Sequence, residues 1–260
     1  MSESLFSIAG KIALVTGGAR GLGLAITEAY VRGGARVYIA SRNEAACAET
    51  VERLADSGEC IALTADLSNK NEIKTLASTL KEREPALHVL VNNSGKTWGA
   101  PLAEFPYEQW EKITSINLAA PFELTRQLLE PLQAAGKAKD PARIINIGSV
   151  AGETTDNIHA YSYAASKAAL HQVTRVLAGE LAQKNITVNA IAPGWFPTKM
   201  SAFIMKDNNL SREMLATIPL NRFGEPEDIA GLALFLATRA SAYMTGNVIP
   251  LDGGQLVRPK

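Results

Sequence analysis

Two hydrophobic patterns alternate along the chain. Short apolar runs rich in β-branched residues, typical of strands buried on both faces, are followed by longer segments with apolar residues at helical spacing. The expected strands are residues 11–16, 36–40, 60–64, 88–91, 143–147, 186–190 and 247–250. The expected helices are residues 22–32, 43–56, 69–83, 107–135, 163–183 and 227–237. This order predicts right-handed β–α–β crossovers and an α/β fold: a doubly wound parallel sheet of about seven strands with helices on both faces.

No linker-like, repeated or low-complexity segment divides the chain, so residues 1–260 are expected to form a single domain. Residues 193–219 follow neither pattern and are long for a connection in a compact domain. Irregular stretches of this length are often binding segments. We therefore expect an irregular substrate-binding loop at about 193–219.

Composition narrows the classes of partner. Hydrophobic residues make up 47 % of the chain, and 26 basic residues balance 26 acidic ones, so the formal net charge is zero. Proteins that bind nucleic acid or anionic membranes normally carry a basic excess. The chain has no signal-peptide pattern, and no apolar run approaches the ~18 residues of a membrane span. Its two cysteines are too few for a disulfide framework. We expect a soluble cytoplasmic protein with no nucleic-acid or membrane partner.

A glycine-rich turn, TGGARGLG at residues 16–23, joins the first expected strand to the first expected helix. Glycines there let the backbone approach a pyrophosphate, which the N–H groups of the helix N-terminus can bind. The G-x3-G-x-G spacing differs from the six-residue dinucleotide fingerprint. The alternative to a nucleotide site is a glycine-rich turn between strand and helix that binds no ligand. The pattern favours a nucleotide. The expected contacts are Gly17, Ala19, Arg20, Gly21, Leu22 and Gly23.

The second expected strand ends in Ser41 and Arg42, where sites that prefer NAD usually present an acidic residue to the adenosine ribose. Arg42 and Arg20 could bind a 2′-phosphate, which a carboxylate would repel. Solvated surface arginines are the alternative. The combination favours NADP(H) as cofactor.

Two polar turns follow the third and fourth expected strands. Asp66 and Leu67 could meet the adenine edge, although Asp66 could equally cap the next helix. The turn NNSG at 92–95 is either part of the cofactor site or a simple polar turn.

Tyr163 and Lys167 are four residues apart at the start of a helical segment and therefore share one helix face. A neighbouring cation favours phenolate and should lower a phenol pKa that is about 10 in isolation. Ser149 follows the fifth expected strand, at the sheet edge where open parallel sheets bind ligands. Tyr161 has Ala165, not a cation, four residues later. Such pairs are often accidental, but the shared edge makes Tyr163 and Lys167 a candidate acid–base site.

Pro121 interrupts the helical segment 107–135. In a continuous helix, residue 121 would donate its N–H to the carbonyl of Asn117, but proline has no N–H and crowds that carbonyl. We expect a kink that leaves the Asn117 carbonyl free to hold water. Alternatively, Pro121 starts a second helix, which also releases the carbonyl.

Together these motifs resemble the short-chain dehydrogenase/reductase family, and the similarity extends over essentially the whole chain. The resemblance implies a Rossmann-type fold and four catalytic residues. Ser149 would hold the substrate carbonyl, Tyr163 would exchange a proton, Lys167 would bind the nicotinamide ribose and Asn117 would hold a relay water. The expected cofactor contacts beyond the glycine turn are Ser41, Arg42, Asn43, Asp66, Leu67, Asn93, Ser94, Gly95, Tyr163, Lys167, Pro193, Gly194, Phe196 and Thr198.

Apolar side chains gather in residues 193–219 and after the NNSG turn, which suits a hydrophobic substrate chain better than a free sugar. A core or oligomer contact is the alternative. The tentative substrate contacts are Trp98, Ser149, Trp195, Met200 and Phe203.

Within the family, the sequence is most similar to bacterial NADPH-dependent 3-oxoacyl reductases, especially those associated with rhamnolipid synthesis. This implies an oxidoreductase that reduces a 3-oxoacyl thioester to the 3-hydroxyacyl product. The family is commonly tetrameric, so a homotetramer is expected.

Two other functions stay open. A dehydrogenase for a sugar acid, polyol or cyclic alcohol, of the gluconate 5-dehydrogenase type, would share these motifs. A nucleotide-sensing protein would keep the fold without turnover. No metal site is expected, because His88, His159 and His171 lack metal-ligand spacing and are interpreted as structural or surface residues.

Overall fold

The computed structural model describes residues 5–155, 159–199, 201–202 and 207–257. They fold around one seven-stranded sheet with the strand order β3-β2-β1-β4-β5-β6-β7, in which every neighbouring pair is parallel. The strands are β1 (Ile12–Thr16), β2 (Arg36–Ser41), β3 (Cys60–Thr64), β4 (Val89–Asn92), β5 (Ala142–Ile147), β6 (Ile186–Pro193) and β7 (Val248–Leu251). The predicted doubly wound parallel sheet is confirmed. Its order reverses between β1 and β4, which is where such sheets bind ligands.

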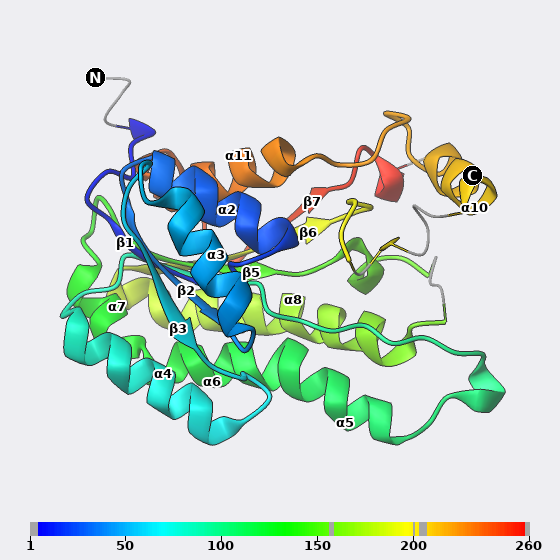
Figure 1. Cartoon of the computed structure of the whole chain (residues 1–260), viewed down its shortest axis with the longest axis horizontal. Helices are drawn as coiled ribbons and strands as arrows, with labels where there is room; N and C mark the ends of the chain where they lie inside the picture. Colours follow the sequence, from blue (N-terminus) through cyan, green and yellow to red (C-terminus); the bar gives the residue numbers. More distant parts are fainter. Residues whose placement is uncertain (1–4, 156–158, 200, 203–206, 258–260) are drawn as a thin grey trace.

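Helices cover both faces of the sheet (Figure 1). Those on one face are α2 (Gly21–Arg32), α3 (Glu44–Leu54) and α11 (Pro226–Ala237). Those on the other are α4 (Lys70–Arg83), α5 (Glu108–Thr114), α6 (Ala120–Gln127), α7 (Leu129–Ala135) and α8 (Tyr161–Leu181). A further helix is α10 (Asn208–Ala216), drawn in yellow-orange in Figure 1.

Each face of the sheet has its own hydrophobic core, which explains the continuous apolar strands. Side chains alternate between the faces along a strand, so Leu14 of β1 joins one core while Ala13 and Val15 join the other. All three side chains are fully buried. Because helices cover both faces, neither set of positions needs to be polar.

The helix predicted over 107–135 is interrupted as Pro121 suggested. Ser115–Ala119 form a π-helix between α5 and α6, in which Ala120 donates its N–H to the Ser115 carbonyl, five residues earlier. Pro121 lies in the first turn of α6 and cannot donate to the carbonyl of Asn117. π-turns occur mostly as short bulges of this kind, frequently at functional sites. The predicted interruption is confirmed, and Asn117 lies inside it.

The other predicted ends of strands and helices differ from the observed ones by at most three residues, but one prediction is wrong. Residues 193–219 are not irregular throughout, because they contain α10. The Asp207 side chain caps this helix by accepting the N–H groups of Asn209 and Leu210. The helix has only nine residues, so its apolar pattern is shorter than the window in which helical periodicity is recognised.

Candidate active site

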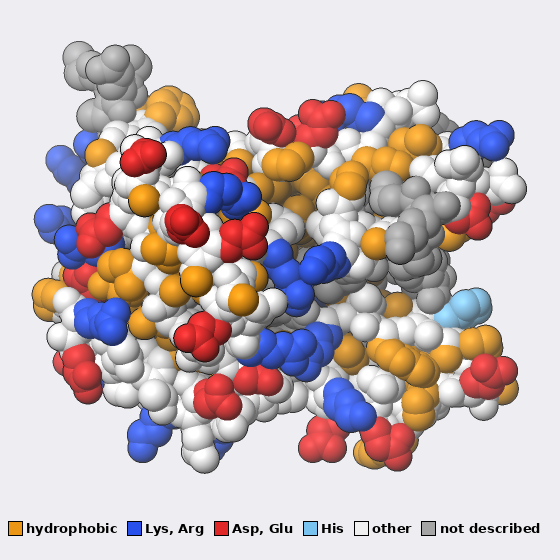
Figure 2. Space-filling model, viewed as in Figure 1, with side chains coloured by type: hydrophobic (Ala, Val, Ile, Leu, Met, Phe, Trp, Pro, Cys, Tyr) orange, Lys and Arg blue, Asp and Glu red, His pale blue; other side chains and the backbone are white. Residues whose placement is uncertain are grey.

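A cavity of about 620 Å³ lies at the carboxyl edge of the sheet. The glycine turn, the ends of β2 to β5, the start of α8 and the segment after β6 all contribute to its wall. Figure 2 shows Lys and Arg side chains gathered around the hollow in the middle of this face. Among the described residues, the cations that line the cavity are Arg20, Arg42, Lys96, Lys167 and Lys199, and the one carboxylate is that of Asp66. The cavity is therefore suited to an anionic ligand.

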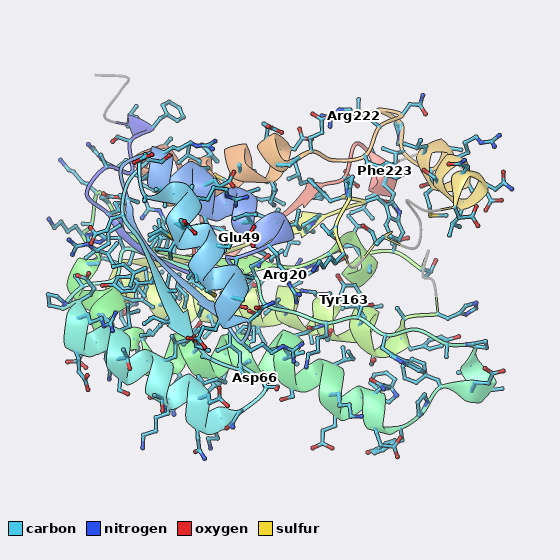
Figure 3. All side chains as sticks on the ribbon, viewed as in Figure 1. Arg20, Glu49, Asp66, Tyr163, Arg222 and Phe223 are labelled. Atoms are coloured by element: carbon cyan, nitrogen blue, oxygen red, sulfur yellow. The ribbon has the colours of Figure 1, made fainter. Side chains whose placement is uncertain are left out.

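Most of the predicted cofactor residues come together around this cavity. Those in its lining are Gly17, Arg20, Gly21, Leu22, Ser41, Arg42, Asp66, Leu67, Asn93, Ser94, Gly95, Tyr163, Lys167, Pro193, Gly194, Phe196 and Thr198. Arg20, Asp66 and Tyr163, labelled in Figure 3, come from segments far apart in the sequence and lie around the same hollow.

Three predicted contacts lie outside the lining and support it instead. Ala19 is buried in the core, and Asn43 caps α3 by accepting the N–H of Ala46. A Cβ on Gly23 would lie 2.3 Å from the carbonyl oxygen of Gly17, so glycine is what lets α2 approach the turn. The cofactor contacts of these three residues stay predictions, and what the structure shows is how each of them supports the turn.

The NNSG turn is bonded to the glycine turn. The hydroxyl of Thr16 accepts the N–H groups of Asn93 and Ser94 at 2.9 and 3.0 Å. The amide of Asn93 donates to the Thr16 carbonyl at 2.8 Å. Gly17 has φ +66°, a left-handed conformation that favours glycine. The two turns thus form one wall of the cavity.

Arg42 and Asp66 lie together in the cavity wall, with 3.7 Å between Nη1 and Oδ2. Hydrogen bonds from Ser68 lower the pKa of Asp66, and the charges of Arg42 and Lys96 lower it further. Asp66 does not cap the next helix, because Asn69 occupies the N-cap of α4. The helix-cap alternative for Asp66 is therefore wrong.

The side chain of Asn117 joins the loop after β4 to α8. Its Oδ1 accepts the N–H of Lys96, and its Nδ2 donates to the Lys96 carbonyl, both at 2.9 Å. Nδ2 also lies 3.0 Å from Oγ of Ser166, which in turn donates to the Tyr163 carbonyl at 2.7 Å. The sequence pointed to the backbone carbonyl of Asn117 and gave no signal for this role of the amide.

Ser149, Tyr163 and Lys167 come together at one end of the cavity. Nζ of Lys167 donates to the Ile147 carbonyl at 2.6 Å and lies 5.7 Å from the centroid of the Tyr163 ring. Burial lowers the pKa of Lys167 to about 8. Burial also raises the pKa of Tyr163, against the opposing effect of a hydrogen bond with Ser149. The predicted lowering of the Tyr163 pKa is therefore wrong for this structure, because desolvation of the phenolate outweighs the effects that favour it.

His171 was missed as a neighbour of the site. It is 1 % exposed and lies one turn beyond Lys167 on α8. Its Nε2 accepts the N–H of Ser149 at 3.4 Å, and its Nδ1 lies 2.8 Å from a carboxylate oxygen of Glu153. The four-residue spacing from Tyr163 through Lys167 to His171 would have placed all three on one helix face.

The tentative substrate residues divide into three groups. Ser149 and Trp195 line the cavity. Trp98 is absent from the lining, and its ring packs edge-on against Phe105 with 5.0 Å between centroids; its substrate contact stays a prediction. Met200 and Phe203 lie outside the described residues.

None of the described helices has both the length and the apolar character needed to cross a bilayer. Within the described ranges, no three His, Cys, Asp or Glu side chains are grouped so that they could hold a metal ion.

Comparisons with known sequences agree with this architecture. A family model described as enoyl-(acyl carrier protein) reductase matches residues 17–255. The chain is 49 % identical to the rhamnolipids biosynthesis 3-oxoacyl-[acyl-carrier-protein] reductase of Pseudomonas aeruginosa, over 96 % of this chain and 97 % of the relative. It is 34 % identical to the 5-keto-D-gluconate 5-reductase of Escherichia coli K12, over 98 % of this chain and 99 % of the relative.

Two solved structures are also similar to this chain. A Pseudomonas aeruginosa RhlG/NADP active-site complex has a TM-score of 0.95 and 48 % identity, covering 98 % of this chain and 99 % of that one. A gluconate 5-dehydrogenase from Burkholderia cenocepacia, in complex with NADP and tartrate, has a TM-score of 0.93 and 28 % identity, covering both chains fully. Both of these structures are complexes with NADP.

Proposed function

Because this chain belongs to the short-chain dehydrogenase/reductase family, we propose that it is an NADP(H)-dependent oxidoreductase that reduces a 3-oxoacyl thioester to the 3-hydroxyacyl product. One observation carries the proposal: Ser149, Tyr163 and Lys167 line the same cavity as two arginines, one in the glycine turn (Arg20) and one directly after β2 (Arg42). A hydride donor with a 2′-phosphate and a carbonyl acceptor could therefore meet in one space.

The residues around the glycine turn fit a dinucleotide. The N-terminus of α2 has no side-chain cap and no acidic residue in its first turn, so its N–H groups and positive dipole are available to a pyrophosphate. Arg20, Ser41 and Arg42 would hold the 2′-phosphate. Asp66 and Leu67 would meet the adenine.

The other end of the cavity would take the nicotinamide. Lys167 would bind its ribose, and Pro193, Gly194, Phe196 and Thr198 would surround the ring, all of them in the cavity lining. When bound, the cofactor supplies the hydride that reduces the carbonyl carbon.

The chain's own residues would stabilise and protonate the oxygen of the reacting carbonyl. The hydroxyls of Ser149 and Tyr163 would donate hydrogen bonds to it as negative charge develops. Because burial raises its pKa, Tyr163 keeps its proton at neutral pH and can pass it to the far more basic alkoxide. The nearby charge of Lys167 would stabilise the phenolate that results. The carbonyl of Asn117, inside the π-helix, would hold a water through which Tyr163 is reprotonated.

The cavity wall next to Ser149 supports an acyl substrate. It is made of small or apolar side chains from the loop after β5, the start of α8 and the segment after β6. These are Val150, Ala151, Ala160, Ala164 and Trp195. An alkyl chain could replace water along this wall, which favours a hydrophobic substrate. We assign the segment at 193–219 to substrate binding for the same reason.

A sugar-acid dehydrogenase is the second candidate, because the gluconate enzymes share this fold and length. The cations Lys96 and Lys199 in the cavity lining could pair with the carboxylate of a sugar acid.

We also propose a cytoplasmic homotetramer. Large apolar side chains are exposed on three neighbouring helices: Trp110 of α5 is 39 % exposed, Phe122 of α6 is 47 % and Val176 of α8 is 58 %. Contacts between subunits through these helices would cover them.

A substrate panel separates the two candidate reactions. We expect kcat/KM for NADPH oxidation to be roughly a hundredfold higher with 3-oxoacyl-coenzyme A esters than with 5-keto-D-gluconate. Burial contributes about 0.8 kcal/mol per methylene, so four methylenes give this ratio. The reverse ratio would favour the sugar-acid function. NADPH binding without turnover of either class would favour a nucleotide sensor.

Loss of the Tyr163 hydroxyl tests the proton donor. Tyr163→Phe should bind NADPH normally but lower kcat by about 10²–10⁴, the usual contribution of a general acid. Tyr161→Phe is the matched control, because Tyr161 packs on Phe105 outside the cavity lining. Steady-state kinetics and cofactor titration measure both effects. A Tyr163→Phe enzyme as fast as the Tyr161 control would remove Tyr163 from the mechanism.

Charge reversal at Arg42 tests the 2′-phosphate site. Arg42→Asp should raise the KM for NADPH at least about tenfold more than the KM for NADH, because the new carboxylate repels only the 2′-phosphate. Arg53→Asp, on the exposed side of α3, should change both values equally. Equal changes in the Arg42 variant would mean that Arg42 does not contact the 2′-phosphate.

A further inference from the structure

The buried ring of His171 pairs with the exposed carboxylate of Glu153, directly behind the candidate catalytic serine. His171 lies on the same face of α8 as Tyr163 and Lys167, and Glu153 follows the short 3-10 helix that begins after Ser149. Neither residue is part of the cavity lining. The pair can therefore affect the reaction only through the residues that it positions.

The two hydrogen bonds of the ring determine where its hydrogen lies. Nε2 lies 3.4 Å from the backbone nitrogen of Ser149, and a backbone N–H can only donate. Nε2 must therefore accept and carry no hydrogen. Nδ1 then carries the hydrogen and donates it to Glu153 at 2.8 Å. The carboxylate and the serine N–H select the same tautomer.

Two side chains of α8 thus hold the end of β5. Lys167 donates to the carbonyl of Ile147, and His171 accepts the N–H of Ser149, two residues later. Gly148 lies between them, and a Cβ there would approach His171 Nε2 to 2.2 Å. The helix that carries Tyr163 is therefore tied to the strand end that carries Ser149, with no space between them for a side chain at position 148.

We propose that His171, held in its Nδ1–H tautomer by Glu153, is a positioning residue that sets Ser149 relative to Tyr163. This role rests on the proposed function of Ser149 as a carbonyl-binding residue. It holds for any carbonyl substrate, whether an acyl thioester or a sugar acid.

Burial favours the neutral form of the ring. Burial lowers the pKa of His171, the charges of Lys167 and Arg175 lower it further, and Glu153 acts in the opposite direction. The ring therefore gains its second proton only below the ordinary histidine range, about pH 6.5. Below that point Nε2 would carry a hydrogen and could no longer accept the Ser149 N–H. Turnover should then fall on the acid side.

Substitution of Glu153 tests the proposal without touching the cavity. Glu153→Gln keeps an oxygen that can accept from Nδ1–H, so kcat should stay within about twofold of wild type. Glu153→Leu removes the acceptor and lets the ring carry its hydrogen on Nε2, so kcat should fall about tenfold with the Kd for NADPH unchanged. Glu180→Leu controls for the loss of a carboxylate. Glu180 is exposed on α8, the helix that carries His171, and its substitution should leave kcat unchanged.

Nitrogen NMR of ¹⁵N-histidine-labelled protein reads the tautomer directly. We expect wild type and Glu153→Gln to show Nδ1 protonated and Nε2 unprotonated at pH 7, and Glu153→Leu to show protonated Nε2. This measurement needs no substrate. It therefore tests the tautomer of His171 separately from the proposed reaction. A wild-type spectrum with protonated Nε2 would overturn the proposal even if no variant folded. So would a Glu153→Leu enzyme with wild-type kcat.

Discussion

The ammonium group of Lys167 is buried at the end of β5, and the rest of the candidate site is arranged around it. A buried charge is costly unless it is paired or hydrogen-bonded, and here the Ile147 carbonyl accepts its bond. That bond ties α8, with Tyr163, to the strand end that leads into Ser149. The remaining cost of burial brings the pKa of Lys167 to about 8, close to the physiological range. Lys167 therefore carries its charge mainly below about pH 8.

The two ends of the cavity differ in chemistry. At one end, two arginines and an uncapped helix N-terminus present positive charge, as a phosphorylated dinucleotide requires. At the other, small and apolar side chains surround Ser149, the reacting end of the proposed mechanism. The relatives agree on the first end and differ on the second, since their names include both acyl and gluconate substrates. The fold alone cannot decide between these substrates, and the assignment depends on the wall beside Ser149.

The sequence predicted whatever depends on local chemistry. Apolar runs gave the sheet, and Pro121 gave the helix interruption because a missing N–H acts within one turn. What depends on tertiary contacts was missed. Burial reversed the expected pKa shift of Tyr163, and the sequence did not show that Trp98 packs on Phe105. His171 meets Ser149 only after the chain has folded, although its spacing on α8 was visible. The amide of Asn117 had no comparable signal.

The pH dependence of kcat/KM for carbonyl reduction tests the role of the buried lysine most directly, because this parameter reports the pKa values of the free enzyme. Burial disfavours the ammonium, so Lys167 should lose its charge as the pH rises through about 8, while Tyr163, with its raised pKa, keeps its proton. The account predicts that kcat/KM falls above pH 8 as the phenolate loses its neighbouring cation. A rate that stays constant up to about pH 10, the ordinary range of lysine, would contradict it.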